Sequence, residues 1–311
     1  MLVLERLRFG FVRWFQQDVP LTVLLLLLVA CGRINFDPTN ESACSRPSIT
    51  LPAPPTTMFG APIALSTLNS IDSDDDPTLT DDQLEIIFQS GRGGQNRLWH
   101  SIRASTIDPW PAPTPITELD GIATNTPELS RDGLRLRFAL PGIAGPEDLY
   151  EVSRPDRASP WGNLKPLEGL ETDAAETGAA EFLDGHGLVF YSSRPGGTAA
   201  EDLWEAYDDS CTGFFDPTPL AGGVATGVPK GNPWMRNDGL VVAYNSDGTL
   251  GNGDFFIASR SVVGGPFDTP VELVSVSSTN VDDDPWLDDA MQSIYFASAR
   301  AGSQDLYYAS R

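Results

Sequence analysis

The sequence predicts an all-β protein assembled from five similar units. Three observations lead to this fold class. One short segment recurs five times, apolar and polar residues alternate within the copies, and no helical period follows residue 31. Alternation over short runs is typical of half-buried strands. A period of this length is typical of repeat architectures in which each unit is one supersecondary element.

The clearest recurring segment closes each unit. Its copies are RLWHSIR (97–103), DLYEVSR (148–154), DLWEAYD (202–208), DFFIASR (254–260) and DLYYASR (305–311). Successive copies are 51, 54, 52 and 51 residues apart. Four of the five copies end on arginine, and the third ends on Asp208.

A second segment opens each unit. Four copies align without gaps: DPTLTDDQLEIIF (76–88), TPELSRDGLRLRF (126–138), NPWMRNDGLVVAY (232–244) and DPWLDDAMQSIYF (284–296). The remaining copy, AAEFLDGHGLVF (179–190), lacks the proline and is the most degenerate. Asp-Gly and Gly-Gly pairs lie within and between the two segments, and they favour tight hairpin turns.

A third element follows the closing segment. Twelve residues after the landmark apolar residue of each of the first four units stands a large aromatic: Trp110, Trp161, Phe215 and Phe267. A proline comes a few residues later, so this stretch is predicted to be an outer strand. Each unit then holds about four short strands, the size of one propeller blade. The sequence therefore predicts a five-bladed β-propeller of four-stranded blades.

The repeat pattern also resembles a known family. The run Pro-x-Leu-Ser-x-Asp-Gly-x-x-Leu-x-Phe-x-Ser-x-Arg-x-Gly-Gly-x-x-Asp-Leu-Tyr looks like the WD40-like repeat of TolB-type periplasmic propellers, and the similarity covers residues 59–311. The resemblance implies the propeller architecture, which hosts many functions. The chain departs from TolB because it has no separate N-terminal α/β domain, so TolB's partner contacts are not carried over.

The fifth unit lacks an outer strand of its own. The stretch FGAPIALSTLNSIDSDDDP (59–77) matches FDTPVELVSVSSTNVDDDP (267–285) at a constant offset of 208 residues. We therefore expect residues 59–65 to pair with the strand that ends at Arg311. Phe59 is expected to pack where the outer-strand aromatics pack in the other blades, namely Trp110, Trp161, Phe215 and Phe267. Pairing of this kind closes the ring and removes an exposed sheet edge.

The first thirty residues are predicted to be a signal peptide. Arg6, Arg8 and Arg13 precede the apolar run LTVLLLLLVA (21–30), which is too short to span a bilayer. Residues 28–31 resemble the lipobox of bacterial lipoproteins, which implies cleavage before Cys31 and lipidation of that residue. An ordinary signal peptide with a chance cysteine is the alternative.

These features divide the chain into a signal peptide (1–30), a lipidated cysteine with a Pro/Ser/Thr-rich linker (31–58) and the propeller (59–311). Gly32 after the cysteine favours the outer membrane in the lipoprotein family. The expected location is the cell envelope, on its periplasmic or surface side, with the lipid as the membrane contact.

Net charge limits the partners that the protein can bind, and cysteine content indicates a disulfide. The chain carries 20 basic and 43 acidic residues, a net charge of −23. Such a surface repels nucleic acid. Cys44 and Cys211 are left after Cys31, and an even pair in an export compartment predicts a disulfide. Two free thiols are the alternative.

Acidic residues flank the innermost strands. These are Asp75, Asp76, Glu128, Glu181, Asp283 and Asp284. Five-bladed propellers include glycosidases, which need two carboxyl groups at the channel mouth. Several of these residues share one repeat position, however, which favours a structural role. The clusters DSDDDP and VDDDP also offer oxygen ligands for Ca²⁺, with turn formation as the alternative. With two histidines, no HExxH and no GxSxG, a histidine metal site or a serine hydrolase is not expected.

Trp234 and Trp286 follow the proline of two innermost strands. Strand alternation directs them either to the channel rim, where they would accompany the aspartates in ligand binding, or between blades. The sequence favours a monomeric, lipid-anchored binding or scaffold module for envelope proteins or glycans, without enzymatic activity, cofactor or bound metal. A glycan-degrading enzyme is the alternative, and a purely structural outer-membrane protein is a third possibility.

Overall fold

The computed structural model describes residues 46–55, 58–122, 125–142, 145–209, 213–251 and 253–311. Cys31, Cys44 and Cys211 lie outside these ranges, so the lipidation and the disulfide stay predictions. In the described part of the chain no helix is long and apolar enough to cross a bilayer.

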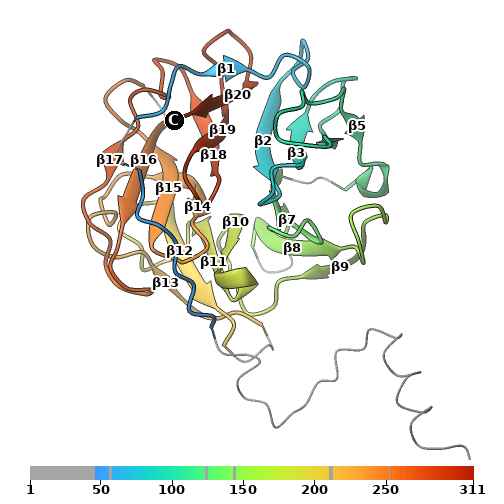
Figure 1. The fold of residues 1–311 in the computed structure, drawn as a ribbon. Helices are drawn as coiled ribbons and strands as arrows, with labels where there is room; N and C mark the ends of the chain where they lie inside the picture. The colour runs from blue at the N-terminus through green and yellow to red at the C-terminus, as the bar shows by residue number, and fades with distance from the viewer. Residues whose placement is uncertain (1–45, 56–57, 123–124, 143–144, 210–212, 252) are drawn as a thin grey trace, which may run out of the picture. The chain divides into compact units, whose positions relative to one another are not determined.

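Five four-stranded antiparallel sheets form a ring, which confirms the predicted five-bladed propeller (Figure 1). The first two blades are β2 (Asp74–Leu79), β3 (Glu85–Ser90), β4 (Arg97–Ile102) and β5 (Thr114–Pro115), then β6 (Asn125–Leu129), β7 (Arg135–Pro141), β8 (Glu147–Ser153) and β9 (Gly162–Pro166). The next two are β10 (Glu176–Phe182), β11 (Gly187–Ser192), β12 (Asp202–Tyr207) and β13 (Phe215–Pro219), then β14 (Lys230–Met235), β15 (Val241–Ser246), β16 (Asp254–Ser259) and β17 (Val271–Glu272).

The fifth blade joins the two ends of the propeller sequence. It consists of β18 (Asp282–Leu287), β19 (Ser293–Ser298), β20 (Asp305–Ser310) and β1 (Ile63–Ala64). Ile63 pairs with Tyr308, and the Gly60 amide donates to the Ser310 carbonyl at 2.8 Å. The predicted closure is therefore confirmed, and Figure 1 shows β1 beside β20.

The core lies between blades. One aromatic of each second strand is buried there at the same repeat position: Phe88, Phe138, Phe190, Tyr244 and Phe296. Burying a side chain of this size stabilises the fold by roughly 1.5–3 kcal/mol. The alternation that the sequence shows is thus the pattern of a sheet packed on both faces against neighbouring blades.

The terminal arginine of the repeat packs on the outer-strand aromatic. The guanidinium carbons lie 4.1–4.5 Å from the ring centroids in the pairs Arg103–Trp110, Arg154–Trp161, Arg260–Phe267 and Arg311–Phe59. The third unit has Asp208 in place of arginine, and here the prediction of Phe215 as the packed aromatic is wrong. Phe215 is 51 % exposed, whereas Phe214 is buried, because without the arginine nothing holds the ring at the later position.

Part of the predicted linker lies against the ring. We call residues 46–55 the strap. Arg46 forms an ion pair with Asp209 at 2.7 Å, and its guanidinium lies 4.1 Å from the ring centre of Tyr207. Further along, the Pro52 and Pro55 carbonyls accept hydrogen bonds from Arg236 and Arg311, respectively, at 2.9 and 2.8 Å. Figure 1 shows the strap in blue, crossing the ring on its way to β1. This half of the linker therefore adds contacts to three blades.

Candidate functional site

The innermost strand of every blade contains a bulge at the same place. The bulged residues all have left-handed backbone, with φ between 44° and 57°: Asp76, Thr126, Gly178, Asn232 and Asp284. The ladder with the second strand slips around this residue in each blade. Bulges re-aim side chains, and here they direct five equivalent residues at the channel axis. All five blades share the bulge, so its left-handed backbone is a feature of the fold. The blades differ in the side chain that the bulged residue carries.

Two neighbouring blades place aspartates at this point. The bulges of β2 and β18 carry Asp76 and Asp284, and each is preceded by a further aspartate, Asp75 and Asp283. The Asp284 carboxyl group hydrogen-bonds with those of Asp76 and Asp75. Two carboxyl groups that hydrogen-bond to each other must share a proton. The structure therefore brings together the four aspartates that the sequence singled out.

Burial and mutual repulsion raise the pKa of the aspartate cluster. The pKa of Asp284 is well above its ordinary value because the group is buried and faces Asp76, Asp283 and Asp75. Burial also raises the pKa of Asp76, and the charge of Asp75 adds to this effect. Asp75 has a raised pKa from burial as well, but Asp284, the Asp76 amide and the Gln304 side chain donate to it and favour its ionised form. Asp284 is thus the proton holder, and Asp75 is the carboxyl group best prepared to ionise.

The outer edge of the cluster is held by amides. The Asn232 side chain donates to Asp283 at 2.6 Å, and Gln304 donates to Asp75 at 3.4 Å. The Asn232 Oδ1 atom is buried and accepts no hydrogen bond among the described residues. Sequence reasoning missed Asn232, although it occupies the repeat position of Asp76 and Asp284 and so was detectable from the alignment of units.

The glutamates of β6 and β10 behave oppositely, and they do not share one repeat position. Glu128 is the second residue after the bulge at Thr126, whereas Glu181 is the third after the bulge at Gly178. Glu128 accepts a bond from Thr78 at 3.3 Å, and burial next to Asp76 raises its pKa to about 8. Glu181 lies 2.8 Å from Arg137 and 3.1 Å from Arg135, and these cations lower its pKa to about 2 despite burial. Glu181 is therefore a structural ion-pair member, whereas Glu128 lies on the channel wall beside the aspartates.

The channel is narrow and filled with side chains. Trp234 and Trp286 line it together with Asp76, Glu128 and Asp284, yet both indoles are buried. The cavity volume here is about 10 Å³, room for about one water molecule. The two tryptophans are thus wall residues packed in the channel rather than exposed platforms for a ligand.

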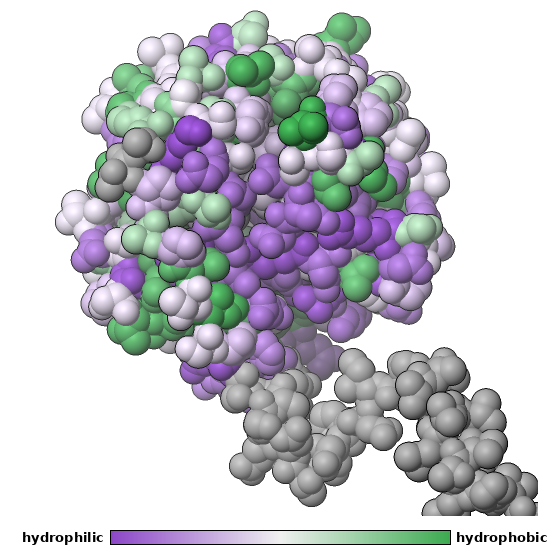
Figure 2. Space-filling model, viewed as in Figure 1, coloured by the Kyte–Doolittle hydropathy of each residue, from purple (hydrophilic) through white to green (hydrophobic). Residues whose placement is uncertain are grey.

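One end of the channel is closed by Arg131. Its guanidinium lies 2.7 Å from Asp289 and 3.4 Å from Asp81, and it donates to the Met235 carbonyl at 3.0 Å. These partners belong to three other blades: Asp289 and Asp81 lie in the turns after β18 and β2, and Met235 ends β14. Hydrophilic residues gather over the middle of one face of the ring in Figure 2. The aspartate cluster lies at the other end of the channel from Arg131, at the amino-terminal ends of β2 and β18.

A metal site is not evident from the arrangement of donors. In the part of the chain that is described, no group of three or more His, Cys, Asp or Glu side chains is arranged to hold a metal ion. Binding of Ca²⁺ by the acidic clusters stays a prediction.

The ring is similar in fold to solved structures of TolB and of arabinofuranosidases. TolB from Acinetobacter baumannii is 17% identical with a TM-score of 0.51, over 78% of this chain and 55% of that chain, so this chain spans about half of the TolB length. The α-L-arabinofuranosidase PaAbf62A from Podospora anserina, solved with cellotriose, is 13% identical (TM-score 0.55, 83% of this chain and 98% of that chain). The catalytic domain of a GH62 α-L-arabinofuranosidase from Coprinopsis cinerea is 11% identical (TM-score 0.57, with the same coverage).

This likeness shows the fold alone. No protein-family model matches the sequence, and no curated protein matches it either. The structures do correct one expectation of the sequence analysis. The absence of enzymatic activity was inferred from the lack of common catalytic motifs and from candidate carboxyl groups that follow the repeat, but glycoside hydrolases share this fold. Glycosidases need only two carboxyl groups and no sequence motif of the kind sought, so that inference was wrong.

Proposed function

We propose that this chain is a carbohydrate-active enzyme that cleaves glycosidic bonds at the channel mouth, beside the amino-terminal ends of β2 and β18. The observation that carries the proposal is that the bulges of β2 and β18 bring the carboxyl group of Asp284 against those of Asp75 and Asp76, within reach of one another for a hydrogen bond. Glycoside hydrolysis requires one carboxyl group that is protonated near neutral pH and a second one that is ionised.

The roles follow from the hydrogen bonds. Asp284 donates its proton to the oxygen of the departing sugar, so the glycosidic bond breaks without expelling an alkoxide. Asp75, once ionised, accepts a proton from the water that attacks the anomeric carbon. Substrate binding breaks the contact between Asp284 and Asp75, because the two carboxyl groups of a glycosidase stand at least about 5 Å apart. The small cavity means that the sugar lies over the carboxyl groups and does not enter the channel.

Substitution of the two aspartates tests this assignment. Asp284→Asn and Asp75→Asn are each expected to lower the rate of glycoside hydrolysis by about 10²–10⁴-fold, the usual contribution of an acid or base. The assay is release of reducing sugar, or of a chromophore from aryl glycosides, over a panel of pentosides and hexosides. Asp247, which is exposed on the loop between β15 and β16, provides the matched control, and Asp247→Asn is expected to keep full activity. Full activity of Asp284→Asn, or an inactive native protein on every glycoside, would contradict the proposal.

We also propose that the enzyme is anchored in the cell envelope through lipid on Cys31. The lipobox-like residues 28–31 after a ten-residue apolar run support this. Mass spectrometry of the mature protein is expected to find an acylated Cys31 at its amino terminus. Cys31→Ser is expected to move the protein from the membrane fraction to the soluble fraction. An unmodified amino terminus at another residue would contradict the anchor.

A further inference from the structure

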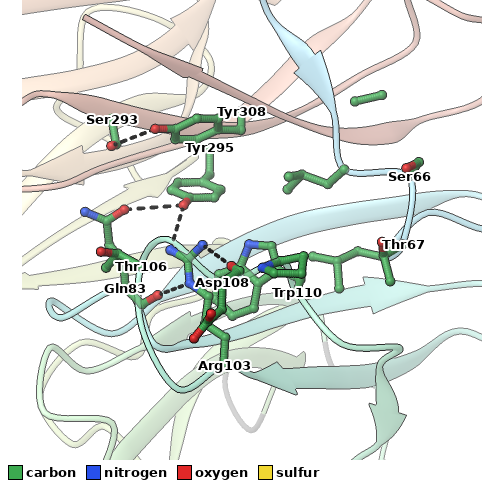
Figure 3. Close-up of a pocket in the computed structure, with 14 residues that line it drawn as sticks. Ser66, Thr67, Gln83, Arg103, Thr106, Asp108, Trp110, Ser293, Tyr295 and Tyr308 are labelled. Carbon is green, nitrogen blue, oxygen red and sulfur yellow. Dashed lines mark hydrogen bonds between the residues drawn. The ribbon is translucent and has the colours of Figure 1, made fainter.

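A cavity of about 470 Å³ lies between the fifth and first blades (Figure 3). It lies at the opposite end of the innermost strands from the aspartate cluster, because Gln83 on its wall belongs to the turn that follows β2. Its other walls include Arg103 and Trp110 from the first blade and Ser293, Tyr295 and Tyr308 from the fifth. The volume is within the usual range for small-molecule sites.

The five blade junctions can be compared with one another because the units are repeats. In two other junctions, the arginine equivalent to Arg103 is closed by a glutamate of the preceding blade. Arg154 lies 2.5 Å from Glu85. Arg260 holds both oxygens of Glu205, at 3.0 and 2.8 Å. Both pairs are buried, where a guanidinium and a carboxylate stabilise each other through charge-assisted hydrogen bonds.

The junction at the cavity lacks this carboxylate. The fifth blade has Ser293 at the repeat position of Glu85 and Tyr308 at that of Glu205. Both residues line the cavity, and their hydroxyl groups lie 3.5 Å apart. At the remaining arginine, Arg311, the strap supplies the Pro55 carbonyl.

Arg103 is buried but has only neutral acceptors. Its guanidinium donates to the Gln83 carbonyl at 2.9 Å, to the Asp108 carbonyl at 3.5 Å and to the Tyr295 hydroxyl at 3.2 Å. Arginine has five N–H donors, so one on each terminal nitrogen has no acceptor among the described residues. Figure 3 shows the guanidinium between Gln83 and Tyr295 at the cavity wall.

We propose that this cavity binds an external carboxylate in the place that Glu85 and Glu205 take at the other junctions, and that the ligand is an acidic sugar such as a hexuronate. The paired free donors on the two terminal nitrogens of Arg103 match the two oxygens of a carboxylate. Hydroxyl and amide groups around the cavity suit the hydroxyl groups of a sugar: Ser66, Thr67, Gln83, Thr106 and Ser293. The tyrosine rings provide apolar contact area.

One charge opposes the ligand. Asp108 also lines the cavity, and its exposed carboxylate accepts a bond from Ser105 at 2.9 Å. This carboxylate repels an anion at the rim, so Asp108→Asn is expected to tighten binding. The opposite effects expected at Asp108 and Arg103 separate an electrostatic site from a merely apolar one.

The test is isothermal titration calorimetry with glucuronate. Glucose, which lacks only the carboxylate, is the control ligand. Native protein is expected to bind glucuronate at least about tenfold more tightly than glucose, because glucose leaves the arginine donors unpaired. Arg103→Gln is expected to remove this preference. Acetate is expected to bind weakly because it lacks the hydroxyl groups. Equal affinity for acetate and glucuronate would overturn the sugar assignment, and equal affinity for glucose and glucuronate would overturn the carboxylate site.

A second variant restores the pattern of the repeat. Ser293→Glu introduces a carboxylate at the repeat position of Glu85, where it can pair with Arg103. This variant is therefore expected to have a higher melting temperature and to lose glucuronate binding. Ser293→Gln has the same size without the charge and is expected to leave the melting temperature unchanged. Glucuronate binding that survives in Ser293→Glu would contradict the proposal. Glucuronate binding is measured without turnover and is expected to persist in Asp284→Asn. Loss of the proposed binding site can therefore be distinguished from failure of the proposed hydrolysis.

Discussion

A shortened chain that begins at residue 67 is expected to aggregate or to melt at a far lower temperature, whereas one that begins at residue 46 is expected to melt as the full chain does. The first loses β1 and Phe59, and the second keeps both. Without β1 the edge of β20 is free to pair with other chains. Thermal unfolding under reducing conditions checks this, because both shortened chains lack Cys44 and would otherwise differ from the full chain in any disulfide.

Phe59 accounts for much of the expected loss. It is 4 % exposed and lies under the Arg311 guanidinium. Truncation of a buried phenylalanine typically costs about 3–5 kcal/mol, a large share of a typical stability of about 5–15 kcal/mol. Phe59→Ala in the full chain is therefore expected to lower the free energy of unfolding by this amount. Phe215→Ala is the matched control and is expected to cost little, since that ring is half exposed.

A third shortened chain measures how much the strap contributes to stability. A chain that begins at residue 59 keeps the closing strand but loses the Arg46–Asp209 ion pair and the carbonyl partners of Arg236 and Arg311. Removing partners from a buried guanidinium such as that of Arg236 leaves donors unsatisfied, so we expect a measurable but smaller loss. Equal melting temperatures for chains that begin at 46 and 67 would show that β1 does not close the ring.

Raising the pH from about 5 to about 9 is expected to lower the melting temperature. Glu128 has a folded-state pKa of about 8, and the pKa values of Asp76, Asp283 and Asp284 are also raised. Between the ordinary carboxyl pKa near 4 and these raised values, the folded state binds more protons than the unfolded state. The contribution of these groups to stability is therefore greatest below the ordinary pKa and falls as the pH rises. The slope is roughly 1.4 kcal/mol per pH unit for each group that stays protonated.

Neutral substitution is expected to flatten this dependence. Asp284→Asn removes the proton holder and its repulsion of Asp76 and Asp283, so the variant is expected to be more stable than the native protein at pH 8–9. Asp247→Asn, at an exposed position, is expected to leave the slope unchanged. A native slope that persists in Asp284→Asn would contradict the shared proton. If calcium chloride removes the slope in native protein but has no effect on Asp284→Asn, the cluster is a cation site.

The sequence by itself determined the number of blades, their four strands and the way the ring closes. These features follow from a local period, because each unit repeats its own strand and turn chemistry and the offset of 208 residues pairs Phe59 with Phe267. The prediction was wrong where the repeat is degraded. In the third unit the loss of the arginine moved the packed aromatic from Phe215 to Phe214.

The sequence also named Asp75, Asp76, Asp283 and Asp284, but their chemistry was decided by the tertiary structure. Protonation depends on which carboxyl groups meet, and the bulges of β2 and β18 bring Asp284 against Asp76 across 208 residues of chain. The contrast between Glu128 and Glu181 has the same origin. Glu181 forms an ion pair with Arg137, whereas Glu128 lies beside Asp76.

The acidic-sugar cavity could be found only by comparing junctions in space. Ser293 and Tyr308 are unremarkable in the sequence, and their meaning depends on which residue of the next blade faces them. A repeat dictates the strands of each unit through local pattern. Charge balance at a junction depends on two units at once, and ring closure makes the fifth and first units neighbours. That is why the sequence alone determined the architecture, while the tertiary structure decided where protons are held and where a buried arginine is left open.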